Sequence, residues 1–484
     1  MKEFDWSKPQ RQPIAGLGIV FLNTLWEIIK RFWPVALVFI LGRSNKVDRF
    51  EIFMLAFLVI TIVTSLFRFL YFRFYLEGNK LIIKKGWLNK ETQVIPLEKI
   101  QTVNIEQGPL HQMLNIVKLT IDTAGSQKAE ATIGALHQSM AHALRQQLLA
   151  HSSDQINSNE QRPVLKPLIR LEASDLLKLS ISANHLEAFF LLLSFGFGLY
   201  ENLNNIDSTL LPGLDEFMPD QALWSILILI ITVLIITIIV STIRIFFRFY
   251  HFRMLRNDKG YHVRSGLTNI KERLVGLNKI QFISWKANWI RRLMGLWIFE
   301  YHMAGGDQVK ETQKVQIPIT RDDFIPILAN DYQAIADTSD AVNVRMHSSF
   351  VVRRLLILGL IPAALLSLVL WWSLGWNVLY SLFLPAIVLI IAWCHYRKFR
   401  LWAMDDAIKI RKGIFGEEFI LMQWHKLQAV TISQSIFQRR KGLANVFLHT
   451  AGGSIKIPFI NLEAAQQISD YALYRVEASK NGWM

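Results

Sequence analysis

The stretch Glu98–Ile105 reads "EKIQTVNI", and close copies of it occur at two later places in the chain. The second copy is "NKIQFISW" at Asn278–Trp285, and the third is "HKLQAVTI" at His425–Ile432. A phrase that returns three times in one chain indicates an internal repeat, in which each copy belongs to one structural unit. The repeat therefore decides how the chain is divided into domains.

Glycines at fixed distances from the phrase extend the repeat to a whole domain. In each copy a glycine (Gly86, Gly266 or Gly413) precedes the glutamine by 15 residues, and another glycine follows it by 24 residues. Equal offsets in three copies predict three domains of the same fold. The signature residues are Lys99, Gln101 and Gly125, then Lys279, Gln281 and Gly305, then Lys426, Gln428 and Gly452.

Each copy is predicted to begin with β structure. Apolar and polar residues alternate into a glycine turn, as in "DAIKIRKGIF" (Asp406–Phe415), which is typical of strands. Within the quoted phrase, Val103 and Ile105 share one face of a strand, whereas Ile100 has the opposite parity. The apolar pattern therefore predicts a bend or bulge near Lys99–Gln101.

A tight turn and a closing helix complete the unit. Gly295 and Gly442 occupy the position of Asn115 in the first copy, and these residue types accept a positive φ. We therefore expect about six or seven strands, a shared turn and one helix in each unit. The predicted helices cover 135–150 and begin at Thr320 and at Asn461.

Long apolar runs predict a membrane protein. The chain is 52% hydrophobic and 19% charged, and Ala222–Ile243 is a charge-free run of 22 residues, which is long enough to cross a bilayer as a helix. Such runs pair into three hairpins, each placed ahead of one repeated domain. The six predicted spans pair as about 25–42 with 52–67, 182–200 with 222–243, and 355–372 with 376–394.

The charge around the hairpins predicts their orientation. A basic, aromatic collar follows each hairpin, whereas the loops 201–221 and 373–375 contain no Lys or Arg. By the positive-inside rule, the collars and the domains after them face the cytoplasm. The first loop, "GRSNKVDR", carries three cations and departs from the rule. The alternative is that the collars only anchor the helices at the level of the lipid headgroups.

The order and spacing of these motifs resemble the membrane-flanked bacterial PH-like domain proteins, a family of poorly defined function. The likeness is carried by "KIQ" or "KLQ", by "RRLMGL" (Arg291–Leu296) and "RRKGLA" (Arg439–Ala444), and by "MAGG" and "TAGG". It covers essentially the whole chain in three tandem copies, although the first copy has "HQMLNI" (His111–Ile116) in place of the arginine turn.

The resemblance implies a multi-pass α-helical membrane protein with α+β PH-like domains, each a β-sandwich or roll with a C-terminal helix. It also implies a place in the bacterial cytoplasmic (inner) membrane. The predicted divisions are the N-terminal segment with transmembrane hairpin 1 at 1–67, PH-like domain 1 at 68–150, a polar linker at 151–169, hairpin 2 at 170–243, PH-like domain 2 at 244–338, hairpin 3 at 339–394 and PH-like domain 3 at 395–484.

The sequence offers no residue set for catalysis. It contains no phosphate-binding glycine loop, nucleophile elbow or metalloprotease histidine pair, and its twelve histidines do not cluster with carboxylates at metal-ligand spacing. The single cysteine, Cys394, ends a predicted span, where a packing role is expected. We therefore predict a non-enzymatic protein with no catalytic residue, no cofactor and no metal site.

Basic residues before the shared turn are the candidate ligand-binding groups. Arg291 and Arg292 in the second copy and Arg439, Arg440 and Lys441 in the third lie at equivalent positions. Guanidinium and ammonium groups on one loop suit a phosphate or carboxylate, in keeping with the net charge of +15. The alternative is a solvated loop that adds nonspecific attraction to an anionic membrane surface.

These features predict a membrane scaffold that binds a protein partner, an anionic lipid headgroup, or both. The expected partners are the bilayer, anionic headgroups and other membrane proteins, among them a smaller relative with one such domain; no nucleic-acid module is recognised. The alternative function is transport or export of a lipid-like or antimicrobial compound, with the domains as regulators. Its only sequence support is the charged group Glu27, Lys30 and Arg31, which is also expected to pair locally on an interfacial helix.

Overall fold

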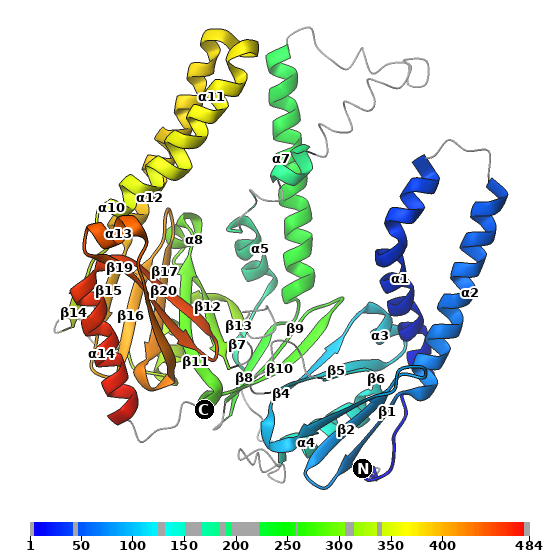
Figure 1. The fold of residues 1–484 in the computed structure, drawn as a ribbon. Coiled ribbons are helices and arrows are strands. Elements are labelled where there is room, and N and C mark those ends of the chain that lie inside the picture. Colours follow the sequence, from blue (N-terminus) through cyan, green and yellow to red (C-terminus); the bar gives the residue numbers. More distant parts are fainter. Residues whose placement is uncertain are drawn as a thin grey trace.

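The structure is a computed structural model of the 484-residue chain. It describes residues 4–41, 47–123, 131–150, 167–183, 185, 189–194, 222–257, 260–304, 314–335 and 341–478. Figure 1 shows β-rich domains in a row, with long helices that project from one side of the row. The three repeats predicted from the sequence follow one another along this row.

Each repeat contains two groups of three antiparallel strands, a short helix between strands of the second group, and a closing helix. In the first repeat these elements are β1 (Arg73–Glu77), β2 (Lys80–Lys85), β3 (Glu91–Pro96), β4 (Ile100–Gln107), α3 (Pro109–Met113), β5 (Ile116–Thr123), β6 (Ala131–His137) and α4 (Gln138–Ala150). In the second they are β8 (Arg253–Asn257), β9 (Gly260–Ser265), β10 (Ile270–Gly276), β11 (Ile280–Ala287), α8 (Trp289–Leu293), β12 (Leu296–Met303), β13 (Lys314–Arg321) and α9 (Phe324–Asn330). In the third they are β15 (Arg400–Ala403), β16 (Ala407–Lys412), β17 (Glu417–Gln423), β18 (Leu427–Ser433), α13 (Ile436–Arg440), β19 (Leu443–Thr450), β20 (Gly453–Asn461) and α14 (Leu462–Ala478).

The predicted bulge occurs in all three copies. A single 3-10 turn (Leu97–Lys99, Leu277–Lys279 or Trp424–Lys426) ends just before the fourth strand of each repeat. The pairing register of that strand then shifts across the glutamine of the phrase, between Ile100 and Thr102 in the first copy and at the same place in the others. The shift lets apolar residues of opposite parity reach the same core.

The shared tight turn is also confirmed. Asn115, Gly295 and Gly442 have φ values of 50°, 63° and 61°, so all three adopt the left-handed conformation. The closing helix of the second repeat begins later than predicted from Thr320. That residue pairs with Trp297 in the ladder of β12 and β13, which extends the strand to Arg321 and leaves α9 with seven residues.

The sheets do not stop at the domain boundaries. The second strand group of one repeat continues into the first group of the next, so that β4 pairs with β10 and β11 pairs with β17. Two seven-stranded sheets result, in the orders β6-β5-β4-β10-β9-β8-β7 and β13-β12-β11-β17-β16-β15-β14. Three-stranded sheets of β1 to β3 and of β18 to β20 remain at the two ends of the row. Consecutive repeats are therefore joined by backbone pairing as well as by side chains.

A short extended segment leads into each hairpin and lies beside the first strand of its own domain. β7 (Pro167–Arg170) pairs with β8, and β14 (Val342–Val344) pairs with β15. In the first repeat Gln10 forms an isolated bridge with Phe74 of β1. β7 crosses the predicted boundary between the linker and the second hairpin. The chain therefore enters and leaves each hairpin at the same edge of the domain.

Three helical segments within the described residues are long and apolar enough to cross a membrane, namely Ile230–Phe249, Ser349–Val369 and Tyr380–Lys398. The helices of the hairpins are α1 (Gly16–Leu41), α2 (Val47–Tyr71), α5 (Ala173–Ile181), α7 (Ala222–Phe249), α10 (Ser349–Arg354), α11 (Ile361–Leu374) and α12 (Phe383–Lys398), with a π-helical segment (Leu355–Leu360) between α10 and α11. α2 contributes a shorter apolar run, Ala56–Tyr71. Much of the predicted span 182–200 lies outside the described residues.

Candidate functional site

A cavity of about 820 Å³ lies between the base of α7 and the strands of the second domain. One wall is the last two turns of α7, which supply Ile243 and Phe247 together with two arginines. The other walls come from β9, β10, β11, β12 and β13. The cationic lining residues are Arg244, Arg248, Lys271, Arg273, Lys286 and Lys314.

The local structure fixes α7 above this cavity. The turn after β9 donates two backbone hydrogen bonds to the end of the helix, from Gly266 N to the Tyr250 carbonyl at 3.0 Å and from Leu267 N to the Phe247 carbonyl at 2.9 Å. These donors satisfy carbonyl groups that a helix end leaves without an intrahelical partner. Gly266 has a φ of 110°, and a β-carbon there would lie 2.1 Å from the Asn269 carbonyl oxygen. The glycine of the repeat therefore allows the tight turn that carries these two donors.

The cavity is strongly cationic. Its lining holds six Lys and Arg side chains and one carboxylate, that of Glu300. Glu300 is paired with Lys286 at 2.7 Å, and Arg273 donates to the Lys314 carbonyl at 2.7 Å, which links β10 to β13. Arg244 and Arg248 are one helical turn apart and therefore share a face of α7. Cations beside an apolar helix match a ligand with an anionic head and an apolar tail.

Arg291 holds the second domain to its hairpin. Its Nε donates to the Ser182 hydroxyl at 3.1 Å, and the neighbouring Asn288 donates to the Ser182 carbonyl at 2.6 Å. Asn288 also caps α8 by accepting from the Arg291 backbone at 2.9 Å. Burial lowers the pKa of Arg291 to about 10, because water is excluded from its charged form. The side chain is thus engaged at a contact next to α5.

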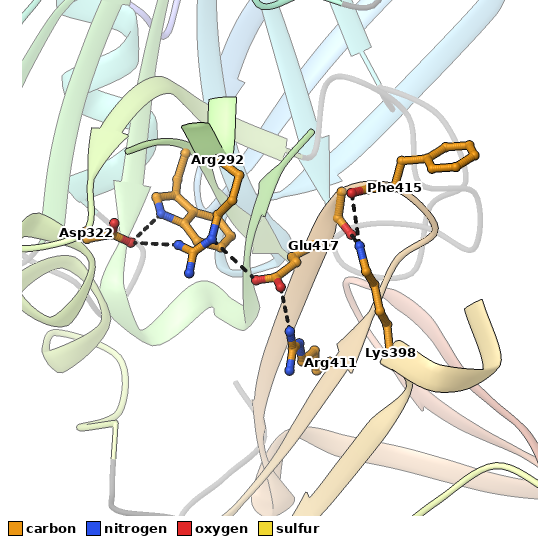
Figure 2. A network of polar contacts seen from close by, with 8 residues as sticks. Arg292, Asp322, Lys398, Arg411, Phe415 and Glu417 are labelled. Atoms are coloured by element: carbon orange, nitrogen blue, oxygen red, sulfur yellow. Dashed lines mark hydrogen bonds and ion pairs between the residues drawn. The ribbon is translucent and has the colours of Figure 1, made fainter. Parts of the chain in front are cut away.

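Arg292 belongs to a network that joins the second and third domains (Figure 2). Its guanidinium lies 3.4 Å from Asp322 in its own repeat and 3.8 Å from Glu417 in the third repeat. Glu417 is paired in turn with Arg411 at 2.5 Å. The guanidinium also stacks over Trp297, 5.0 Å from the ring centroid. This arginine therefore serves the junction between the repeats.

The third basic turn is arranged differently. Arg439, Arg440 and Lys441 are exposed, and Lys441 donates to the Ser349 hydroxyl at the start of α10 at 3.2 Å. Two exposed apolar residues of the same short helix, Ile436 and Phe437, accompany them. Figure 1 places α13 on the side of the domain from which the third hairpin projects. Cations next to exposed apolar side chains at this level suit the headgroup region of a membrane.

Two residues of the repeat signature, Gln281 and Lys426, are buried where the second and third repeats meet. Lys426 is buried and donates from Nζ to the carbonyl of Asn278 in the second repeat at 3.0 Å, while burial lowers its pKa. Gln281 is fully buried, whereas Gln428 and Lys99 are exposed and Lys279 is half-buried. Gly125 and Gly305 lie outside the described residues, and the side chain of Gln101 is not described.

A buried serine–histidine–glutamate cluster escaped the sequence analysis. The Ser284 hydroxyl lies 2.9 Å from Nε2 of His302, and the Glu300 carboxylate lies 3.7 Å from the same nitrogen. In a hydrolase triad the carboxylate orients the opposite ring nitrogen. Burial holds the pKa of His302 well below its usual value. The geometry thus fits a packed cross-strand contact and does not match a nucleophilic triad.

The charged group on the first hairpin pairs across the helices. Glu27 of α1 accepts from Arg68 of α2 at 2.8 Å, while Lys30 lies over the Trp26 ring, 5.2 Å from its centroid. Of the group expected to pair locally, Glu27 thus bonds from α1 to α2 and Lys30 contacts Trp26, whereas the side chain of Arg31 lies outside those described. The ion pair borders a cavity of about 580 Å³ that also includes Trp87 and Leu88 of the first domain.

Sequence reasoning did not identify the cavity under α7. Its cations come from the collar, from β10, from β11 and from β13, which lie up to 70 residues apart in the chain. The collar residues Arg244 and Arg248 form a basic aromatic stretch in the sequence, which predicts the orientation of the hairpin or its anchoring at the lipid headgroups. Only the fold brings Lys271 and Lys314 beside them.

Comparison with known proteins matches this architecture. A family model described as "Bacterial PH domain" matches residues 27–152, 206–323 and 353–476. A relative from Bacillus subtilis (strain 168), named "UPF0699 transmembrane protein YdbT", is 23% identical over 460 residues, which are 91% of this chain and 92% of the relative. The protein is thus a membrane protein with internally repeated PH-like domains. Because the three matches follow the three structural repeats and span most of the sequence, the chain belongs to the bacterial PH domain family.

Proposed function

We propose that the protein is a multi-pass inner-membrane scaffold that binds anionic phospholipid headgroups, with the cavity under α7 as its main site. The observation that carries the proposal is the placement of six cations at the foot of an apolar helix. A phospholipid in the leaflet next to the domains would extend its chains along Ile243 and Phe247 and its phosphate towards Arg248 and Lys271. Arginine and lysine together supply directed donors and charge for a phosphate group.

The short helices of the repeats support a placement of the domains with this side against the membrane. In addition to α13, α8 exposes Leu293 and α3 exposes Met113, each with about four-fifths of its side-chain surface accessible (80% and 82%). These helices lie on the side of the domains from which the long helices project (Figure 1). Their apolar tips would reach the interface of the bilayer, and the domains would face the cytoplasm, where anionic lipids attract basic segments. The scaffold role rests on three such domains in one chain, because linked weak sites raise effective concentration.

The experiment is a lipid-retention measurement. The full chain is reconstituted with equal amounts of phosphatidylglycerol and phosphatidylcholine, extracted gently, and analysed by native mass spectrometry. The test variant carries Arg248→Gln and Lys271→Gln, and the matched control carries Lys80→Gln and Lys456→Gln, which remove two exposed lysines outside the cavity. At about 1 kcal/mol per cation near a membrane surface, the test pair should weaken retention of phosphatidylglycerol roughly 30-fold.

The control pair should retain phosphatidylglycerol as the unaltered protein does. If the test variant and the control variant retain equal amounts of phosphatidylglycerol, the cavity under α7 is not the lipid-binding site. Equal retention of the two lipids by the unaltered protein would remove headgroup selectivity altogether.

A further inference from the structure

The two junctions between repeats use one and the same pairing register. At the first junction Glu272 of β10 lies opposite Ile105 of β4, and at the second Phe419 of β17 lies opposite Trp285 of β11. In both pairs the first residue is six positions after the leading glycine of its repeat, and the second is four positions after the glutamine of the preceding repeat. The repeats are therefore joined by one interface that is used twice.

The same interface is left half-complete at each end of the row. β3 is equivalent to β10 and β17, and it is an edge strand of its three-stranded sheet. β18 is equivalent to β4 and β11, and it is likewise an edge strand. No other strand of the described part of the chain pairs with either of these two edges. The first repeat thus leaves unpaired the strand that corresponds to β10 and β17, and the third repeat leaves unpaired the strand that corresponds to β4 and β11.

Burial follows this difference. Trp285 at the second junction is 5% exposed, whereas Ile432, its equivalent on β18, is 36% exposed. Leu421 of β17 is buried, whereas Val94, its counterpart on β3, is 47% exposed. Natural edge strands are usually protected by charged residues, but β18 reads "LQAVTIS" and carries none. β18 is therefore an exposed edge strand without charged residues, whereas β3 ("ETQVIP") carries one charged residue, Glu91, and a proline at its ends.

The signature lysine shows the same pattern. Lys426 is buried at the second junction, where it donates to the carbonyl of Asn278. Its equivalent in the first repeat, Lys99, is exposed. The residue equivalent to Asn278 in the third repeat is His425, which is three positions before the glutamine. Both halves of this side-chain contact are therefore present at the ends of the row.

We propose that a second copy of this chain completes the junction, with β18 of one copy paired to β3 of the next. The register of the internal junctions places Ile432 opposite Thr92 and Val430 opposite Val94, and it directs Lys99 to the carbonyl of His425. Glu91 then faces Ser433, so no like charges meet. A head-to-tail contact of this kind is heterologous, and it builds a ring or a continuing row.

The membrane is compatible with this assembly. The long helices of the three repeats (α1 and α2, α7, and α11 and α12) project from the same side of the row (Figure 1), so the internal junctions already keep neighbouring repeats in one orientation. The first repeat, which contains β3, and the third repeat, which contains β18, lie at opposite ends of the row, with the second repeat between them. One chain therefore leaves both edges open to another copy, and the same junction would keep all hairpins in one bilayer.

Disulfide trapping in native membranes tests the register. All variants carry Cys394→Ser, which removes the only native cysteine. One copy with a first tag carries Ile432→Cys, and a co-expressed copy with a second tag carries Thr92→Cys. Opposite strand residues have Cα atoms about 4.5–5.5 Å apart, within the range of a disulfide. A displacement of two residues adds about 6.8 Å along the strand and places the pair beyond that range, so Ile432→Cys with Val94→Cys is the off-register control.

The internal junction provides the positive control. Gln107→Cys and Ile270→Cys in one chain lie opposite each other at the first junction and should form a disulfide within the chain. The proposal predicts a product that contains both tags for the in-register pair and at least a five-fold lower yield for the off-register pair. The substitution Ile432→Lys puts a charge on the exposed strand β18 that would pair with the partner copy. It should dissociate the assembly, so that mass photometry measures only single chains.

Three results would overturn the proposal. The first is the absence of a doubly tagged product while the internal control is oxidised. The second is an equal yield for the in-register and off-register pairs. The third is a product of Ile432→Cys with a different protein that forms whether or not Thr92→Cys is present, which would assign the β18 edge to another partner.

Discussion

Gly452 of the third repeat lies directly against Gln281 of the second: a β-carbon on Gly452 would come within 2.9 Å of the Gln281 β-carbon and 3.2 Å of the Met303 carbonyl oxygen. Both distances are shorter than ordinary van der Waals contact. The glycine that closes the repeat signature is therefore used to bring two domains together. Gly452 and Lys426 of the third copy of the signature both lie at this junction.

This contact predicts the effect of a small substitution. Gly452→Ala should lower the free energy of unfolding by about 1–3 kcal/mol, because the added methyl group overpacks the junction. Gly108→Ala is the matched control, since its β-carbon would meet only His111 Nδ1 at 3.5 Å. Thermal unfolding of the full chain in detergent measures the difference. Equal midpoints for the two variants would show that the junction is looser than the structure has it.

Arg291 separates a structural role from a ligand-binding role. Arg291→Met should destabilise the protein by about 1–3 kcal/mol, because it leaves the buried Ser182 hydroxyl without its donor. Retention of phosphatidylglycerol per folded molecule should stay unchanged, which native mass spectrometry measures. A loss of bound lipid without a loss of stability would instead show that Arg291 binds the lipid, as the sequence predicted.

The sequence determines the repeat and its local geometry because those signals are short-range. Opposite parity of Ile100 and Val103 predicted the bulge, and the equivalence of Asn115 with Gly295 and Gly442 predicted the turn. The pairing of β11 with β17 is different, because it joins residues about 135 positions apart, and no local pattern states which strand edge lies beside which. The pairing of strands between neighbouring repeats therefore could not be predicted from the sequence and is known only from the fold.

The candidate site shows the same limit. Adjacent arginines such as Arg291 and Arg292 stand out in a sequence, yet the fold commits them to Ser182 and to Glu417. The cavity cations are scattered over a helix and several strands, so no window of sequence contains them. A cluster of basic residues in the sequence shows where cations occur along the chain. It does not show which groups they contact, because those contacts are determined by tertiary packing.

The buried histidine predicts a dependence of stability on pH. His302 lies among Ser284, Glu300 and the cations Lys286, Lys314 and Lys412, and its pKa is held well below 6.5, first by burial and then by the three lysines. The folded state keeps the ring neutral, whereas the unfolded chain protonates it at a pKa near 6.5. Stability is therefore present above that pH and is lost as the pH falls below it.

The contribution of this residue can be measured as a difference between variants. Between pH 7.5 and pH 5.5 the unaltered protein should lose about 1.4 kcal/mol more unfolding free energy than His302→Gln, which does not titrate. Denaturant unfolding at both pH values, followed by intrinsic fluorescence, provides the comparison. If both proteins show the same pH dependence of unfolding free energy, a group other than His302 is responsible for it.

The ion pair of the first hairpin predicts a modest coupling. Glu27 and Arg68 are about half exposed, so their interaction should be worth about 0.5–1 kcal/mol in a double-mutant cycle with Glu27→Gln and Arg68→Gln. The exchanged pair Glu27→Arg with Arg68→Glu should recover most of that energy, because the charges meet again across the helices. Additive effects of the two single substitutions would show that the bond does not hold α1 to α2.

The most direct test of the account is a cryo-electron-microscopy reconstruction of the protein in nanodiscs that contain phosphatidylglycerol. The account predicts headgroup density in the cavity under α7, with the phosphate in contact with Arg248 and Lys271 and the acyl chains along Ile243 and Phe247. A map in which lipids are resolved along the hairpins while this cavity holds only solvent would contradict it.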